Sequence, residues 1–191
     1  MRYPTPLGSA NQTYSRPVIG LHWVMALALA ANFVLGLTMS DLPLSPQKLQ
    51  FYSWHKWAGI TLLGLVTLRL IWRSVVRPPP PLPAPVWQRR IAQFSHLLIY
   101  TLMFAIPISG WLMSSAAGFT VNYLGVLPLP DLVSKNKQLF ELLKETHKIL
   151  NFGLLTLVVL HTLAALKHHF IDRDAALSRM LPWLKMRPLD K

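Results

Sequence analysis

Apolar residues gather along the chain into four long runs, and polar, proline-containing stretches separate them. Each run is long enough for a helix that crosses the roughly 30 Å of hydrocarbon in a bilayer. Proline lacks a backbone N–H and resists helix continuation, so the proline-rich stretches mark the connections. The pattern predicts an all-α integral membrane protein, a single domain over residues 1–191 built as a bundle of four transmembrane helices. The predicted spans are 18–39, 55–72, 91–113 and 147–170.

The composition narrows the classes of function. Apolar residues make up 52% of the 191 residues and charged residues only 14%, which fits a chain embedded in lipid. The formal net charge of +12 is also typical of nucleic-acid binders, but here the charges lie between the apolar runs, so we expect no nucleic-acid partner. The chain has no cysteine, which excludes thiolate-bound iron–sulfur clusters, disulfides and covalently attached haem. Any redox cofactor must be held by other ligands.

Lysine and arginine are distributed unevenly among the connections, and cytoplasmic segments of membrane proteins retain positive charge. The two ends and the middle connection hold 13 of these residues, namely Arg2, Arg16, Arg69, Arg73, Arg77, Arg89, Arg90, Lys167, Arg173, Arg179, Lys185, Arg187 and Lys191. The first and third connections hold 6, namely Lys48, Lys56, Lys135, Lys137, Lys144 and Lys148. We therefore expect both termini in the cytoplasm. The first span has no small-residue cleavage site, so we expect it to remain uncleaved.

Four histidines lie at or inside the apolar spans, where an ionisable group is costly unless it is paired or binds something. They are His22, His55, His147 and His161. His147 and His161 are 14 residues apart, which on a helix places them within about 40° of the same face and about 21 Å apart along the axis. The fourth span therefore offers an imidazole near each membrane surface.

The predicted orientation matches the depths of these histidines in pairs. His22 lies level with His161 near the cytoplasmic side, and His55 lies level with His147 near the outer side. Neutral imidazole is a good ligand for haem iron, and an iron with both axial positions filled serves electron transfer rather than oxygen binding. The four histidines are thus predicted to bind the iron atoms of two b-type haems enclosed by the bundle. The alternative for any one of them is a hydrogen-bonded residue in helix packing.

Three further histidines lie near the cytoplasmic ends of the spans. His96, at the start of the third span, competes with His22 as an inner ligand. We prefer His22 because it lies deeper in its apolar run, and we interpret His96 as packing or hydrogen bonding near the inner haem. His168 follows His161 by seven residues and so shares nearly the same face, where an imidazole can bind a quinone carbonyl and exchange its protons. The alternative for His168 and His169 is a solvated helix end.

The order and spacing of several short motifs are similar to those of the bacterial cytochrome b561 family, whose members are four-helix di-haem proteins of the inner membrane. The resemblance covers nearly the whole chain and implies haem ligands at His22, His55, His147 and His161. The motifs are Tyr14-Ser15-Arg16, Gly20-Leu21-His22-Trp23, His55-Lys56-Trp57-Ala58-Gly59, Arg69-Leu70-Ile71-Trp72-Arg73, His96-Leu97-Leu98-Ile99-Tyr100, Leu166-Lys167-His168-His169-Phe170 and Arg179-Met180-Leu181-Pro182.

This resemblance implies the activity of a superoxide oxidase, which takes electrons from superoxide at the periplasmic face and reduces ubiquinone. Such an enzyme needs positive charge near its outer haem to attract a small anion. Lys56 and Lys148 each follow a predicted outer ligand directly, so we expect them to act on superoxide. Ordinary solvated loop charges remain the alternative for both lysines.

Two other functions are compatible with these patterns. A cytochrome b subunit that receives electrons from a periplasmic dehydrogenase or hydrogenase would have the same fold and haems, and the outer connection at 114–146 is large enough for such a partner to dock. A haem-free membrane scaffold or transporter would use its histidines only for packing or proton relay. Haem content and copurifying partners distinguish the three.

Overall fold

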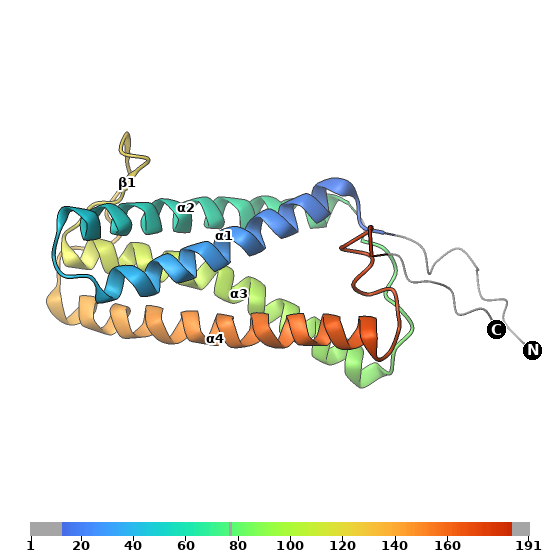
Figure 1. Ribbon diagram of the computed structural model, residues 1–191. Helices are drawn as coiled ribbons and strands as arrows, with labels where there is room; N and C mark the ends of the chain where they lie inside the picture. Colours follow the sequence, from blue (N-terminus) through green and yellow to red (C-terminus); the bar gives the residue numbers. More distant parts are fainter. Residues whose placement is uncertain (1–12, 77, 185–191) are drawn as a thin grey trace, which may run out of the picture.

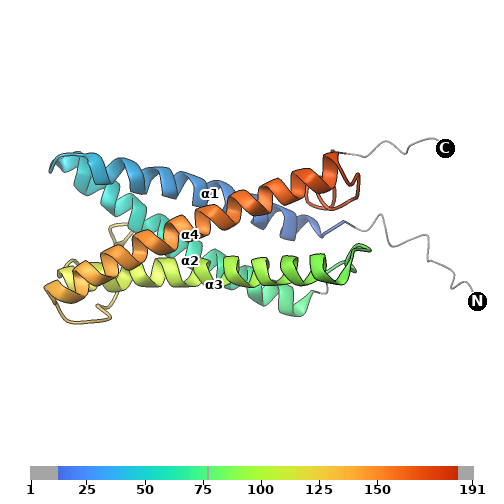
Figure 2. The same ribbon diagram turned by 90° about the horizontal axis from the view of Figure 1, so that it is seen from below.

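Four long helices run side by side in one elongated bundle (Figures 1 and 2). The computed structural model describes residues 13–76 and 78–184. The helices are α1 (Arg16–Asp41), α2 (Pro46–Val75), α3 (Val86–Ala117) and α4 (Lys137–Phe170). All four are long and apolar enough to cross a membrane, and each contains one predicted span. The predicted four-helix membrane fold is confirmed.

Helices α2 and α4 begin earlier than hydropathy predicts, at residue 46 rather than 55 and at residue 137 rather than 147. Each start is capped by a polar side chain. Ser45 Oγ accepts a hydrogen bond from the backbone N–H of Lys48 at 3.2 Å, and the side chain of Asn136 accepts one from Leu139 at 3.0 Å. Such caps stabilise the first helical turn in water. Hydropathy marks only the turns that lie in hydrocarbon, so it missed these polar turns.

The connections gather at two ends of the bundle, which we call outer and inner after the predicted orientation. The α1–α2 and α3–α4 connections lie at the outer end, and the α2–α3 connection lies at the inner end with the start of α1 and the end of α4 (Figure 1). Helix α3 packs against α4 and α2, and α1 packs against α2. All four helices can therefore contribute side chains to one site at each end.

The outer α3–α4 connection contains a small hairpin that the sequence did not predict. Strands β1 (Asn122–Tyr123) and β2 (Leu127–Pro128) pair antiparallel, and the hairpin projects beyond α2 (Figure 1). The indole N–H of Trp57 donates to the backbone oxygen of Asn122 at 2.6 Å, and the hydroxyls of Thr61 and Tyr123 are 2.9 Å apart. The expected loop at 114–146 was too long, because both of its ends are helical.

The segment after α4 folds back over the inner end. The Arg179 guanidinium donates through Nη1 to the backbone oxygen of Pro80 at 2.7 Å, and the Trp23 indole donates to the backbone oxygen of Met180 at 2.9 Å. These bonds tie the segment to α1 and to the α2–α3 connection. Five residues of the orientation count lie outside the described residues, namely Arg2, Arg77, Lys185, Arg187 and Lys191.

The buried core lies midway between the two ends. Met25, Leu62 and Val66 are almost completely buried, and partly buried side chains such as Leu29 and Met103 pack around them. On α1 and α2 these residues lie between the inner and outer polar positions. An apolar layer thus separates two sites, one at each end of the bundle.

Candidate functional site

The structure brings the four span histidines together in two pairs. The ring centroids of His55 and His147 are 6.2 Å apart at the outer end, and those of His22 and His161 are 6.5 Å apart at the inner end. Imidazole nitrogens bind transition metals at about 2 Å, so two imidazoles on opposite sides of one metal have centroids about 6 Å apart. Each pair therefore has the spacing that a single metal between its rings requires.

Each outer histidine donates a hydrogen bond from Nδ1 to a backbone carbonyl oxygen. His55 donates to the backbone oxygen of Asn32 at 3.2 Å. His147 donates to the backbone oxygen of Ile106 at 3.1 Å, and its Nδ1 also lies 2.9 Å from Oγ of the buried Ser109. A proton on Nδ1 leaves the lone pair on Nε2, the nitrogen that can bind a metal. These bonds fix both the tautomer and the direction of each ring.

A glycine makes room for each of these two rings. A Cβ atom on Gly36 or on Gly110 would lie 3.1 Å from Cε1 of His55 or His147, respectively. Gly36 follows Asn32 by four residues, and Gly110 follows Ile106 by four. In an α-helix the carbonyl of residue i points toward residue i+4, so a ring that reaches the carbonyl also lies against residue i+4. Both outer histidines therefore use the same carbonyl-and-glycine arrangement.

The outer pair lines a hollow between the helices, together with the polar residues Asn32, Lys56 and Asn151. The Nζ of Lys56 lies 5.9 Å from the centroid of the Phe119 ring. Lys148 is exposed and does not line this hollow, because the residue after His147 points about 100° away around α4. Of the two predicted lysines, the structure brings only Lys56 to the histidines.

At the inner end a third histidine joins the pair. The His96 ring is 5.6 Å from that of His161, so both His22 and His96 have a separation from His161 that fits a shared metal. His22 and His161 are half-buried, whereas His96 is exposed. These separations do not distinguish His22 from His96 as the partner of His161, so the choice of His22 stays a prediction, which its greater burial favours.

Sequence reasoning missed a half-buried cation at the inner end. Arg69 on α2 donates through Nε to the hydroxyl of Tyr100 at 2.9 Å, while its Nη1 is buried and has no hydrogen-bond partner among residues 13–76 and 78–184. The guanidinium acts electrostatically on His22 and His161. A signal was present, because Arg69 follows His55 by the same 14 residues that separate the two histidines of α4.

His168 lies at the inner end of α4 in contact with two carboxylates. Its Nδ1 is 2.6 Å from Oδ2 of Asp174 and 3.1 Å from Oδ2 of Asp172. Asp172 also pairs with Lys167 at 2.6 Å. An imidazole between carboxylates at a membrane surface can exchange protons with water, but it is also a common way to finish a helix.

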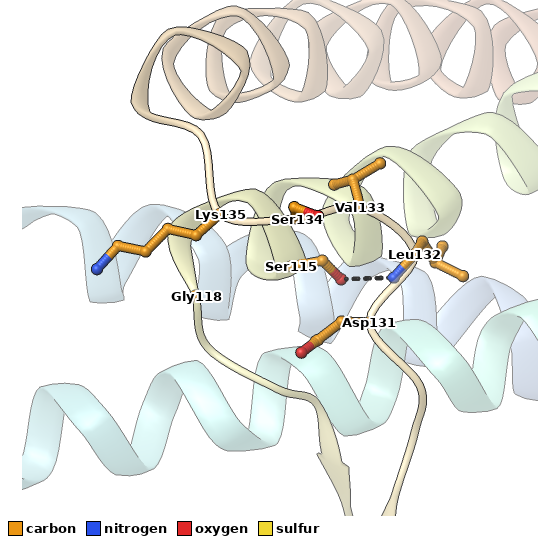
Figure 3. A pocket seen from close by; sticks show the side chains of 7 residues that line it. All are labelled: Ser115, Gly118, Asp131, Leu132, Val133, Ser134 and Lys135. Atoms are coloured by element: carbon orange, nitrogen blue, oxygen red, sulfur yellow. Dashed lines mark hydrogen bonds between the residues drawn. The ribbon is translucent and has the colours of Figure 1, made fainter.

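A separate hollow of about 430 Å³ opens between the end of α3 and the following connection (Figure 3). Its lining residues are Ser115, Gly118, Asp131, Leu132, Val133, Ser134 and Lys135. Ser115 Oγ accepts a hydrogen bond from the backbone N–H of Leu132 at 3.2 Å, and the stem of Lys135 packs against Gly118. These contacts fix the connection that carries the hairpin, and no histidine lines this hollow.

The arrangement at the outer end fits a bis-imidazole haem. Two neutral imidazoles face each other at the required separation, their Nδ1 atoms are occupied, and glycines replace side chains that would displace the rings. At the inner end the same separation recurs near Arg69, which forms no ion pair with any described residue. Nitrogen ligands without cysteine suit haem of the b type, which is not covalently attached.

Comparison with known proteins identifies the family of the chain. The family model for the prokaryotic cytochrome b561 matches residues 13–183. Cytochrome b561 homolog 2 of Escherichia coli (strain K12) is 35% identical over 168 residues, which are 84% of this chain and 86% of the relative. Cytochrome b561 homolog 1 of the same organism is 31% identical over 177 residues, 88% and 97% of the two chains.

A third relative is the probable superoxide oxidase CybB of Yersinia pestis, which is 30% identical over 181 residues, 90% of this chain and 97% of the relative. The family match, over residues 13–183, covers the four helices and both histidine pairs. The chain therefore belongs to the prokaryotic cytochrome b561 family, membrane electron-transfer proteins of the bacterial inner membrane that use haem b.

Proposed function

We propose that this protein is a superoxide oxidase that carries electrons from superoxide at its outer end to ubiquinone. His55 and His147 bind the iron of an outer haem b, and His22 and His161 bind that of an inner one. Two imidazole pairs with single-metal spacing at opposite ends of one bundle are the observation behind the proposal. His96 packs beside the inner haem.

The bound haems supply one-electron transfer between the two ends. The side chains of the protein contribute to this electron transfer in two ways. The paired imidazoles of His55 with His147 and of His22 with His161 would hold the two haem irons and would leave no site for oxygen on them. The layer formed by Met25, Leu62 and Val66 keeps water out of the space between the two sites.

At the outer end Lys56 attracts superoxide to the hollow beside His55 and His147. A relative that carries the name probable superoxide oxidase supports this substrate. Lys148 contributes to the positive potential of the outer surface from its exposed position next to His147. Two superoxide ions give up one electron each and leave as oxygen.

At the inner end ubiquinone accepts the two electrons together with two protons and becomes ubiquinol. His168 hydrogen-bonds a carbonyl oxygen of the quinone and delivers protons that Asp172 and Asp174 receive from the cytoplasm. The carboxylates hold Nδ1 of His168, so its Nε2 is the nitrogen that can face the quinone. Both termini lie in the cytoplasm, which places this proton uptake inside the cell.

The test is ubiquinol formation by the purified protein in a steady flux of superoxide, with and without added superoxide dismutase. Lys56→Gln should lower kcat/KM for superoxide roughly tenfold, because steering charge acts on the rate of encounter. Lys144→Gln is the matched control, since Lys144 is an exposed outer lysine paired with Glu141 at 3.7 Å. A wild-type protein that contains haem but forms no ubiquinol from superoxide would rule out this activity.

One observation favours a second function, a cytochrome b subunit for a periplasmic dehydrogenase or hydrogenase. The hairpin at the outer end exposes apolar side chains, including Leu124 at 55% and Val126 at 82%. Exposed apolar patches often mark docking surfaces. A copurifying periplasmic oxidoreductase that reduces the haems would support this function over the first. Protein purified without haem from cells with ample haem would exclude both and leave the scaffold or transporter.

A further inference from the structure

Helix α2 places a charged residue at the depth of the inner histidines. Arg69 follows His55 by 14 residues, so it lies about 21 Å further along the axis and within about 40° of the same face. On α4 the same spacing leads from His147 to His161. Each of the two helices therefore has an outer histidine and, 14 residues later, a second polar residue near the inner end. On α4 that second residue is His161, a predicted haem ligand, and on α2 it is Arg69.

The contacts of Arg69 leave its charge incompletely satisfied. Its Nε donates to the hydroxyl of Tyr100, and its Nη1 is covered yet has no hydrogen-bond partner within the described part of the chain. None of the ion pairs found between described residues includes Arg69. Arginine stays charged in proteins, and covering part of this charge without an anion costs free energy. No carboxylate among the described residues supplies that anion, so Arg69 is free to bind the anionic group of a ligand.

The surroundings of Arg69 indicate what that anion is. Arg69 lies at the depth of the inner histidines, and its partner Tyr100 follows His96 by one turn on α3, which makes it part of the inner site. His22 and His161 come from α1 and α4, whereas Arg69 and Tyr100 come from the other two helices. The planar fork of a guanidinium matches a carboxylate. A haem b carries two such groups as its propionates.

We propose that Arg69 binds a propionate carboxylate of the inner haem and that Tyr100 holds the guanidinium in place. This inference rests on the inner haem of the proposed function and not on superoxide as the substrate. It assigns Arg69 a positioning and charge-balancing role, in which the ion pair orients the haem and sets its reduction potential.

The experiment measures haem per chain and the midpoint potential of each haem in the purified holoprotein. The inner haem is identified as the one that His161→Ala removes. Arg69→Gln should lower its potential, because loss of a nearby positive charge favours ferric iron. Arg69→Lys keeps the charge but loses the fork, so its shift should be smaller. Tyr100→Phe should also give a smaller downward shift, and the outer haem should stay unchanged in all three.

Arg89→Gln is the matched control, because Arg89 is an exposed arginine in the first turn of α3 at the same end of the bundle. It removes the same charge from a position suited to lipid head groups or solvent. An inner potential that moves no more in Arg69→Gln than in Arg89→Gln would overturn the proposal. So would an equal shift of both haems.

Loss of the inner haem alone in Arg69→Gln would support binding of its propionate by Arg69, because retention of the outer haem shows that the bundle folds. If Arg69→Gln loses both haems, Arg69→Lys and Tyr100→Phe replace it in the test. The proposal would then be overturned if the potential of the inner haem moves no more in these two variants than in the control variant. A wild type without the inner haem would overturn the proposed function together with the binding of a propionate by Arg69. A wild type with both haems but no superoxide activity would overturn the activity alone.

Discussion

At the scale of single residues, each ligand pair makes a separate prediction about haem content. His161→Ala should reduce the protein from two haems per chain to about one by removing the inner haem, and His147→Ala should do so by removing the outer one. The two pairs share no side chain, so the remaining haem keeps both its ligands. Pyridine haemochrome quantification with reduced-minus-oxidised spectra measures this. Full haem content in either variant would refute the assignment.

Gly110 tests the close approach of a ring to a helix backbone. Gly110→Ala should weaken or abolish the outer haem, since the new Cβ would lie 3.1 Å from Cε1 of His147 and push the ring off the carbonyl of Ile106. Haem titration into the haem-free protein gives the loss of affinity. Gly64→Ala is the control, because nothing lies within 4 Å of its Cβ. Alanine there should stabilise α2 by about 0.5–1 kcal/mol and leave haem binding unchanged.

The competition between His22 and His96 is also decided by single residues. His22→Leu should remove the inner haem or leave it with one axial ligand, whereas His96→Leu should keep it six-coordinate, because His96 is the more exposed ring. Electron paramagnetic resonance of the ferric protein distinguishes a bis-imidazole iron from a five-coordinate one. The opposite pattern would make His96 the ligand.

The relative depth and face of two residues on one helix could be predicted from the sequence, because the helical period determines both. The depth of His147 and His161 follows from their spacing on one helix. The partners of the outer rings could not be predicted in this way, because the oxygens of Asn32 and Ile106 belong to backbone that every residue carries. Which carbonyl meets a ring depends on how two helices pack, and neighbouring helices are set by long-range contacts. Arg69, by contrast, could have been predicted as part of the inner site, because it follows His55 by 14 residues on the same helix, but the sequence analysis did not use this spacing.

At the scale of secondary-structure elements, hydropathy found the four helices but not their full lengths. The polar first turns of α2 and α4 depend on the caps Ser45 and Asn136, which act outside hydrocarbon. The hairpin at 122–128 was missed because its two-residue strands are too short for an alternating pattern. It is fixed instead by contacts with Trp57 and Thr61 of α2, far away in the sequence.

The segment after α4 behaves as an element of its own, held by a few hydrogen bonds. Arg179→Gln should free it from the α2–α3 connection, because a charged donor to the backbone oxygen of Pro80 contributes about 1.5–3 kcal/mol. Limited proteolysis should then cleave within 171–184 faster than in the wild type. Arg173→Gln serves as the control at an exposed arginine in the same segment. Equal cleavage rates in all three proteins would show that Arg179 does not hold the segment.

At the scale of the whole molecule, the bundle has two different ends joined by an apolar layer. The outer end carries the hollow beside His55 and His147, with Lys56 at its edge. The inner end carries Arg69 and the carboxylate-bound His168. A current of electrons between these ends is vectorial only if all molecules insert in one direction. Orientation in the membrane therefore decides on which side the donor is oxidised and from which side the quinone takes its protons.

The basic residues at the inner end predict that this end faces the cytoplasm, and the absence of cysteine makes the prediction easy to test. Ser134→Cys lies in the exposed outer connection and Pro83→Cys in the exposed inner one. A membrane-impermeant maleimide should label Ser134→Cys in intact spheroplasts and Pro83→Cys only after permeabilisation. The reverse pattern would place His168 on the periplasmic side and the outer haem on the cytoplasmic side. Quinone protons would then come from the periplasm, and periplasmic superoxide could not reach the hollow lined by Lys56.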